Sequence, residues 1–417
     1  MMEQKKSNIF KEKGKILVPL LLFIIFQSAF NAFSPILSQL AERFPDASTT
    51  TIQMVLSFPS LVSIPVSISA GLLASYIHKK RLVQIALTVM LVGGILPILI
   101  HSSIITVFVS SGFIGLGQGL LISLSGALIA EHFDGNQRGT VFGFKQVASS
   151  VGIAGLTVLV GYLGTIAWYN AYLIYFLLVP ILILVSKFLP LGKLDEKLVG
   201  KGVGLSGIKS LLTPSYIYMC FMVFFMGALL FTFYANIAMM ITEKSLGDSS
   251  AVGQVTALNS LMTIVVGLIF GFILKGLKKY TLSLAMLVMC LAFLILSISN
   301  SFSIIAFGGI VFGIGAGLQQ ASSLYYVSES VSKSSNTLAI AIALALISVG
   351  ISFSPVIVNS IQGTVFGSIT ATSSMLVAGC GYGIMLITEL VRETFFNKDS
   401  MIGKPITETA QNDKDAK

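Results

Sequence analysis

The chain has 417 residues, and its composition is far from that of a water-soluble protein. Hydrophobic residues make up 55% of the chain, charged residues only 10%, and the mean hydropathy is +0.91. A soluble domain carries about 25% charged residues, so this chain cannot cover a surface that faces water. The composition therefore excludes a soluble enzyme, a nucleic-acid-binding domain and a disordered protein. It predicts a polytopic membrane protein.

The formal net charge of +9 is explained by the membrane topology of the chain and requires no acidic partner. The Lys and Arg residues lie almost wholly in alternate connections between apolar runs. If the N-terminus is inside, 24 of the 26 lie in inside segments, and only Arg43 and Lys244 lie outside. Because short loops rich in Lys and Arg stay in the cytoplasm, we predict cytoplasmic termini in a plasma (inner) membrane.

Twelve segments are long and apolar enough to cross a bilayer, which takes about 20 residues of helix. Short strands of alternating polarity, as in a barrel, do not occur in runs such as 82–100. Lys145 is the only Asp, Glu, Lys or Arg within the twelve segments. In chain order they are 16–40, 50–77, 82–101, 104–130, 139–164, 168–186, 214–242, 250–274, 280–299, 303–328, 335–360 and 370–388.

The segment 190–213 interrupts the apolar pattern with charged residues and glycines, and it divides the spans six and six. We therefore predict an N-terminal six-helix bundle at 1–189, a cytoplasmic linker at 190–213, a C-terminal six-helix bundle at 214–396 and a cytoplasmic tail at 397–417. The predicted fold class is an all-α membrane protein with twelve transmembrane helices in two bundles.

A repeat of about half the chain length supports this division. Span four contains Gly115-Leu-Gly117-Gln-Gly119, and span ten contains Gly313-Ile-Gly315-Ala-Gly317, 198 residues later. Glu131 and Glu329 follow the two motifs at the same offset. Matches in order near one offset indicate an internal repeat. We expect these glycines to be helix contacts rather than substrate contacts.

With two parallel six-helix repeats joined by a cytoplasmic linker, the sequence resembles the major facilitator superfamily over nearly its whole length. The loop after span two keeps the glycine and the basic residues of that family's motif, as Gly71, Lys79 and Lys80. Ser75 stands where the family has an acid, so a charge-based latch is not expected there. The resemblance implies a secondary transporter that works by alternating access.

Enzyme chemistry is not expected, because no acids, histidines or cysteines converge at one depth. Cys220, Cys290 and Cys380 are isolated within apolar runs and are expected to be packing residues. There is no P-loop, so the sequence predicts gradient-driven transport without a cofactor or metal. We expect a small-molecule substrate, the lipid bilayer as the surroundings, protons as a candidate coupling ion, no nucleic acid and a monomer.

An ionisable side chain inside a span is a functional candidate, because it is costly there. Lys145 has two interpretations. In the first, its side chain reaches the headgroup region or forms a salt bridge with Glu131 or another loop acid. In the second, it binds an anion or acts in gating. The set assigned to coupling or gating is Lys145, Glu131, Glu329 and Arg138.

The remaining polar side chains in the spans are neutral amides, hydroxyls and aromatics, which suggest a neutral, aromatic-rich cavity. The alternative for any single amide is an interhelical hydrogen bond, worth about 0.6 kcal/mol in membranes. In the resembling family, spans one, four, seven and ten line the central cavity, with help from their neighbours. The candidate substrate-binding residues are Gln27, Phe30, Asn31, Gln118, Phe233, Tyr234, Asn236, Asn259, Gln319, Gln320 and Ser323.

Three functions remain open from the sequence. The favoured one is efflux of an amphiphilic organic compound, with proton antiport as one mode of coupling. The second is uptake of a neutral metabolite by a symporter or facilitator, which the lack of any carboxylate in the spans favours. The third is a lipid flippase or a non-transporting receptor on the same scaffold.

The predicted topology can be tested by labelling single cysteines in a chain whose three native cysteines are replaced. A membrane-impermeant maleimide added to intact cells should label a cysteine at Lys244, and should label one at Lys197 only after permeabilisation. The physical reason is the retention of basic loops in the cytoplasm. Labelling of both positions from the same side would contradict the topology.

Overall fold

The computed structural model describes residues 2–27, 29–133, 135–192, 194, 213–331 and 336–396. Every regular element among these residues is helical. Helices satisfy their own backbone hydrogen bonds, which lipid cannot do, so long apolar segments become helices. Most of the predicted linker and all of the predicted tail lie outside the described residues, so the domain boundaries placed there stay predictions.

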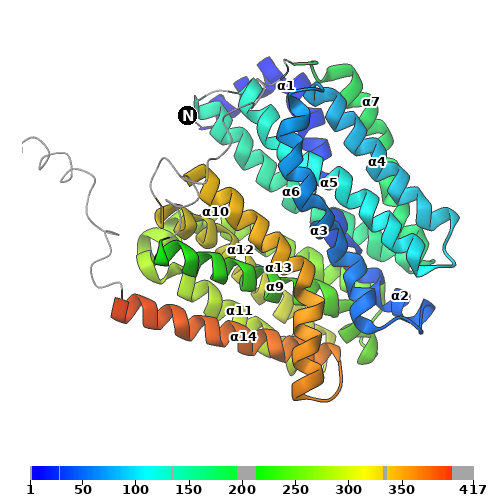
Figure 1. The fold of residues 1–417 in the computed structure, drawn as a ribbon, viewed down its shortest axis with the longest axis vertical. Helices are drawn as coiled ribbons and strands as arrows, with labels where there is room; N and C mark the ends of the chain where they lie inside the picture. The colour runs from blue at the N-terminus through cyan, green and yellow to red at the C-terminus, as the bar shows by residue number, and fades with distance from the viewer. Residues whose placement is uncertain are drawn as a thin grey trace, which may run out of the picture.

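The N-terminal half forms one group of helices, drawn from blue to blue-green in Figure 1. Its elements are α1 (Met2–Phe26), the 3-10 helix η1 (Ala29–Ile36), α2 (Leu37–Arg43), α3 (Thr49–Ala74), α4 (Lys79–Leu99), α5 (Ile104–His132), α6 (Gly135–Gly164), the 3-10 helix η2 (Trp168–Leu177) and α7 (Leu178–Phe188). We refer to this group as the N-bundle.

The C-terminal half forms a second group beside it, drawn from green to red in Figure 1. Its elements are α9 (Pro214–Glu243), α10 (Ser249–Leu277), the 3-10 helix η3 (Lys278–Tyr280), α11 (Thr281–Ser297), α12 (Phe302–Glu329), α13 (Asn336–Val365), α14 (Ala371–Val391) and the π-helical turn η4 (Arg392–Phe396). We refer to this group as the C-bundle.

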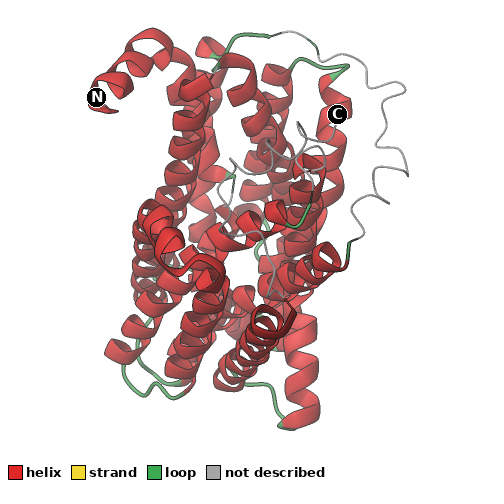
Figure 2. Ribbon diagram, turned by 90° about the vertical axis from the view of Figure 1, so that its left-hand side faces the viewer, coloured by secondary structure: helices red, strands yellow, loops and turns green. Residues whose placement is uncertain are grey.

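Eleven helical segments are long and apolar enough to cross a membrane, and α11, with 17 residues, is a shorter apolar helix. The prediction of an all-α fold with twelve spans in two bundles is thereby confirmed. Figure 2 shows the N-terminal end of the chain at one end of the molecule. We call this end the terminal face. The loop face is the opposite one, and it carries the loops 44–48, 100–103, 165–167, 244–248, 298–301 and 366–370.

Two predicted spans are not single α-helices. The first span is divided into α1, η1 and α2, and the sixth begins as η2 before it continues as α7. Aromatic side chains of the two 3-10 segments pack together, since the Phe33 ring centroid lies 4.7 Å from that of Tyr172 and 5.6 Å from that of Tyr175. Pro35 in η1 also lacks the N–H that a regular helix needs.

Four of the helices that leave the loop face, α3, α5, α12 and α14, begin at hydroxyl N-caps. The Ser48 side chain accepts a hydrogen bond from the Thr51 N–H at the start of α3, and Ser301 does the same for Ile304 at the start of α12. Thr370 and Ser373 form a reciprocal capping box at the start of α14. Such caps satisfy N–H groups that a helix leaves unpaired, so in these four helices the hydroxyl residue marks where the helix starts.

The two bundles pack in the same way. In the N-bundle, α5 packs against α3 and α4, and in the C-bundle α12 packs against α10 and α11. The glycines of the repeated motif make these contacts. A Cβ atom at Gly115 would lie 2.6 Å from the Pro59 carbonyl oxygen of α3, and Gly313 is pressed against the backbone of Asn259 in α10.

The second glycine of each motif packs on a methionine. A Cβ atom at Gly117 would collide with Met90 of α4, and one at Gly315 would lie 2.7 Å from the Met289 sulfur of α11. Small residues let helices approach closely, which is how helices associate in lipid. The repeat read from the sequence therefore corresponds to a repeat of interhelical contacts.

We expect Gly115→Ala to lower the unfolding temperature of the purified protein, and Gly126→Ala, in the same helix, to leave it unchanged or raise it. The added methyl group at Gly115 overlaps Pro59, whereas nothing lies within 4 Å of a Cβ atom at Gly126. Overpacking costs about 1–3 kcal/mol. Thermal unfolding followed by the fluorescence of Trp168, the single tryptophan, measures the difference. Equal unfolding temperatures would contradict the packing argument.

Candidate functional site

The boundary between the N-bundle and the C-bundle, which we call the seam, runs mainly along two helix pairs. α6 packs against α10, and α3 packs against α13. In the first pair, a Cβ atom at Gly161 would lie 2.7 Å from the Ser249 carbonyl oxygen, and one at Gly253 would lie 3.1 Å from that of Thr157. The helices therefore touch backbone to backbone where α6 ends and α10 begins, near the loop face.

Buried amides connect the second pair. Gln53 of α3 donates a hydrogen bond from Nε2 to Asn236 Oδ1 of α9 at 2.8 Å, and its Oε1 accepts one from Asn359 Nδ2 of α13 at 2.8 Å. Gln362 donates to Asn359 Oδ1 and to Ser374 Oγ, at 3.1 and 2.7 Å. Ser374 Oγ in turn donates to Asn236 Oδ1 at 2.9 Å. We call these five residues the seam amide network.

The seam amide network is uncharged and lies out of contact with water. The exposed fraction of its five side chains is between 0% and 4%. Each residue lies within a few turns of the loops 44–48, 244–248 or 366–370. Further bonds cross the seam in the same half, from Gln39 to Ser249 Oγ at 2.7 Å, from Asn359 to Thr50 Oγ1 at 2.9 Å and from Ser57 to the carbonyl oxygen of Ser352 at 3.2 Å. Polar groups buried in lipid need such partners.

Toward the terminal face, the bundles are joined less closely. Among the described residues, the seam has one hydrogen bond in this half, from Gln146 Nε2 of α6 to Gln320 Oε1 of α12 at 3.3 Å. Both of these side chains are exposed. The described state is therefore held closed at the loop face.

The predicted residues of the C-bundle take part in contacts within the protein. The Phe233 ring is fully buried and stacks on Phe312 at 4.1 Å. Asn259 donates a hydrogen bond to the Tyr234 hydroxyl at 3.0 Å, and Gln319 Oε1 accepts one from Tyr382 at 2.7 Å. Asn236 belongs to the seam amide network, Gln320 lies at the seam, and Ser323 Oγ donates to the Gln320 carbonyl oxygen.

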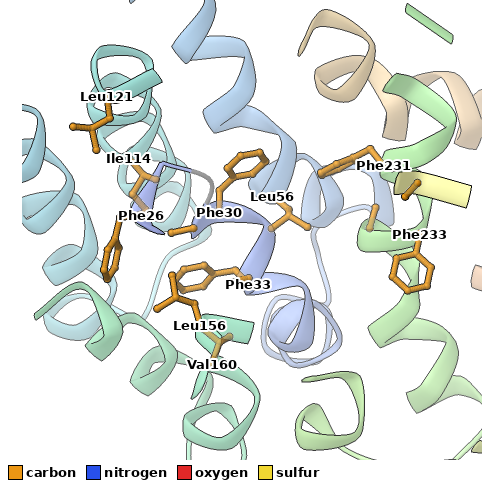
Figure 3. Packing of buried hydrophobic residues seen from close by; sticks show 14 of the residues in the cluster. Phe26, Phe30, Phe33, Leu56, Ile114, Leu121, Leu156, Val160, Phe231 and Phe233 are labelled. Carbon is orange, nitrogen blue, oxygen red and sulfur yellow. The ribbon is translucent and has the colours of Figure 1, made fainter. Parts of the chain in front are cut away.

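The predicted residues of the N-bundle lie around η1 and α5. Phe30 is 6% exposed and lines a pocket with Phe33, Tyr172 and Tyr175. Figure 3 shows Phe30 near Leu56 and Phe33 beside Leu156 and Val160. Asn31 and Gln27 are half-buried. Gln118 is 4% exposed, and its Oε1 has no hydrogen-bond partner in the part of the chain that the structure describes.

The four residues predicted for coupling or gating do not form one cluster. Lys145 donates a hydrogen bond to Ser125 Oγ at 2.8 Å. Glu131 pairs with Lys79 at 2.9 Å, within the N-bundle, so it is not the partner of Lys145. Arg138 donates to the Ala130 carbonyl oxygen at 2.8 Å, and Glu329 is exposed at the end of α12.

Two features lie outside the set predicted from the sequence. Gln53 and Asn359 connect the bundles, and the signal for them was present, since both are amides in the apolar spans two and eleven. At the terminal face of the C-bundle, Arg392 pairs with Glu389 at 2.7 Å and with Glu393 at 2.8 Å. These three charges follow the predicted end of the last span and were assigned to no role.

No group of three His, Cys, Asp or Glu side chains that could hold a metal ion occurs among the described residues. The fold and the seam instead define a class of protein. Two helical bundles of equal architecture meet at a seam that is closed on one face by bonds that can break and re-form. This is the arrangement of a secondary transporter that alternates its access between the two sides of a membrane.

Comparisons with known proteins also indicate a membrane transporter. The model of the Major Facilitator Superfamily matches residues 20–242 and 219–398, and the chain belongs to that family. It is a multi-pass membrane transporter and not an enzyme. No curated protein matches the sequence.

Solved structures share the fold at low sequence identity. The chain is similar to the nucleoside transporter NupG, with a TM-score of 0.72 and 12% identity over 91% of this chain and 99% of that one. It is also similar to a bacterial homologue of the human lysosomal transporter Spinster, in an inward-facing and unoccupied conformation (TM-score 0.69, 11% identity, 91% and 94% coverage). A third similar structure is that of the human organic anion transporter MFSD10 (TM-score 0.61, 14% identity, 91% and 99% coverage).

We expect Gln53→Ala to open the loop face more often. Gln53 makes two amide hydrogen bonds across the seam, and at about 0.6 kcal/mol each their loss shifts the equilibrium several-fold. An impermeant maleimide added from the loop face should label a cysteine at Ser57 about sevenfold faster.

Gln84→Ala is the matched control for this experiment. Gln84 also donates a hydrogen bond, to Ser186 Oγ at 2.8 Å, but that bond stays within the N-bundle. The control should leave the labelling rate unchanged. A labelling rate that does not respond to Gln53→Ala would show that the seam amide network does not hold the loop face closed.

Proposed function

We propose that this chain exports an amphiphilic organic compound by rocking its two bundles about the seam. The observation that carries the proposal is the unequal seam, with buried amides and backbone contacts on the loop face and one exposed amide pair toward the terminal face. With the predicted cytoplasmic termini, this is a state open to the inside of a plasma (inner) membrane. A loading site for export would face that side.

The residues near η1 support an amphiphilic substrate. Phe30, Phe33 and Tyr172 offer apolar and aromatic surface, and Gln27 and Asn31 add half-buried amides on the same span. Aromatic faces and amides together suit a compound with an apolar body and a polar group. We propose Gln27, Phe30, Asn31, Gln118 and Gln320 as the substrate contacts, in a carrier that acts as a monomer.

Coupling to a proton gradient is proposed through acids at the terminal face rather than inside the membrane. Glu131 and Glu329 occupy equivalent ends of α5 and α12, and Glu131 holds Lys79 at 2.9 Å. Protonation of Glu131 would remove this ion pair. Export against proton entry would use that change.

Import of a neutral metabolite is the second candidate. Asp and Glu are absent from the interior of the described spans. A facilitator of a neutral solute needs no intramembrane acid, so this observation favours it. Vesicles of the two orientations distinguish the candidates, because export gives accumulation in inside-out vesicles only.

A cross-link tests the rocking motion. Ser57 of α3 donates its hydrogen bond to Ser352 of α13 across the seam, so cysteines at these two positions can be linked by a short bifunctional maleimide or by oxidation. Solutes that stabilise the purified protein in a thermal-shift screen of amphiphiles, sugars and amino acids would be used in reconstituted vesicles. We expect the cross-link to abolish transport, and reduction of the disulfide to restore it.

Cysteines at Gln84 and Ser186 provide the matched control, because this pair lies within the N-bundle. Their cross-link should leave transport intact. Full transport by the Ser57–Ser352 cross-linked protein would contradict alternating access by rocking of the bundles.

A further inference from the structure

Three polar residues from three helices of the N-bundle form a connected chain around Lys145. Lys145 Nζ of α6 donates to Ser125 Oγ of α5 at 2.8 Å. The Ser125 hydroxyl has two acceptors within reach, Gln27 Oε1, just past α1, at 3.0 Å and the Ile122 carbonyl oxygen at 2.9 Å. The ammonium is thus held inside the bundle by a neutral acceptor. It does not reach toward a headgroup along the outside of α6.

Lys145 has no acidic partner among the described residues. Its one hydrogen bond goes to Ser125, and no ion pair involves it. The nearest acid along α5 is Glu131, six residues beyond Ser125, which is about 9 Å along a helix. That acid is already paired with Lys79. Lys145 is therefore a cation inside a membrane span without a counter-charge, which is a costly arrangement.

The donors around Lys145 are not all used. A lysine ammonium has three N–H donors, and the structure assigns one of them to Ser125. Gln27 uses its oxygen to accept from Ser125, and its Nε2 donates to no described residue. Lys145 and Gln27 are both half-buried, so these donors are not sealed off from the seam. Together they match the oxygens of a carboxylate or a related anion.

The position of Lys145 places these donors beside the transport path proposed above. The next residue, Gln146, bonds across the seam to Gln320. Gly152, two turns further along the face of α6 that bears Lys145, packs on Ile25 of α1, so this face of α6 is turned toward α1. An apolar surface follows toward the loop face, since Phe30, three residues after Gln27, lines the pocket described above.

We infer that Lys145, with Gln27 and Ser125, binds the anionic group of an amphiphilic organic acid, whose apolar part lies toward Phe30. This inference rests on the proposed function and adds the charge of its substrate. An anion at this position supplies the missing counter-charge. It also explains why a lysine is kept where an apolar residue would cost less.

The test uses three probes of one shape, 4-phenylbutanoate, 4-phenylbutan-1-ol and 4-phenylbutylamine, with the full chain in phosphatidylcholine nanodiscs. We expect the carboxylate to bind at least tenfold more tightly than the alcohol, because its hydrogen bond to the ammonium joins two charged groups. The amine should bind most weakly. Thermal shift and calorimetry measure the affinities.

The variants separate charge from packing. Lys145→Met and Lys145→Gln should each lose the tenfold preference for the carboxylate and keep their affinity for the alcohol, whereas Lys145→Arg should retain the preference. Gln27→Ala should weaken carboxylate binding several-fold. Lys275→Met, which removes an exposed lysine at the end of α10, is the matched control and should change nothing.

Each alternative outcome has a defined meaning. Equal affinity for carboxylate and alcohol in the wild-type chain, or a preference that survives both Lys145→Met and Lys145→Gln, would overturn the inference. So would a Lys145-dependent stabilisation by phosphatidylglycerol nanodiscs without any by the free carboxylate, because the anion would then be a lipid headgroup. The proposed function fails separately, if the Ser57–Ser352 cross-link leaves transport unchanged.

Discussion

The structure depends on how helices hold together in a medium that offers neither water nor a hydrophobic force between them. Close packing and hydrogen bonds must supply the attraction. Gly115 against Pro59 and Gly313 against Asn259 provide the packing in the two bundles, and Gly161 against Ser249 provides it between them. Side chains at these positions are small because the neighbouring backbone occupies the space that a Cβ atom would need.

Polar bonding is divided between the seam and the bundles. Among the described residues, the ion pairs join elements of one bundle, as Lys79 with Glu131 and Arg392 with Glu389. The bonds that cross the seam are those of amides and hydroxyls, such as Gln53 with Asn359. The Lys79–Glu131 pair ties α4 to α5, whereas the two pairs of Arg392 lie within the continuous end of α14 and η4. The bonds that cross the seam, which break in the rocking motion proposed above, are neutral.

The sequence predicted the twelve spans, the two bundles and the paired glycine motifs, because length, hydropathy and an internal repeat are local properties. It did not predict the breaks at η1 and η2, which accompany packing between Phe33 and Tyr172, residues far apart in the chain.

The residues of the candidate site were harder to predict from the sequence than the fold was. Gln53, Asn236 and Gln27 all carry amide side chains, so the sequence does not distinguish them. The angle at which the helices pack decides that Gln53 and Asn236 bond to another helix and that Gln27 stays half-exposed. For the same reason the sequence could name Glu131 as a partner for Lys145 but could not show that Lys79 occupies it.

The neutrality of the seam amide network has a consequence for the energetics of transport. Amide bonds in a membrane are worth about 0.6 kcal/mol each, so the two bonds of this network that cross the seam, both made by Gln53, sum to about 1 kcal/mol. Their strength does not change with proton concentration, since none of the five side chains titrates. A small free-energy gap between two states means that a ligand with a modest difference in affinity can reverse their populations. In the rocking mechanism proposed above, these bonds therefore add little to the free-energy difference between the two states, and a ligand that prefers one state by a modest amount can offset them.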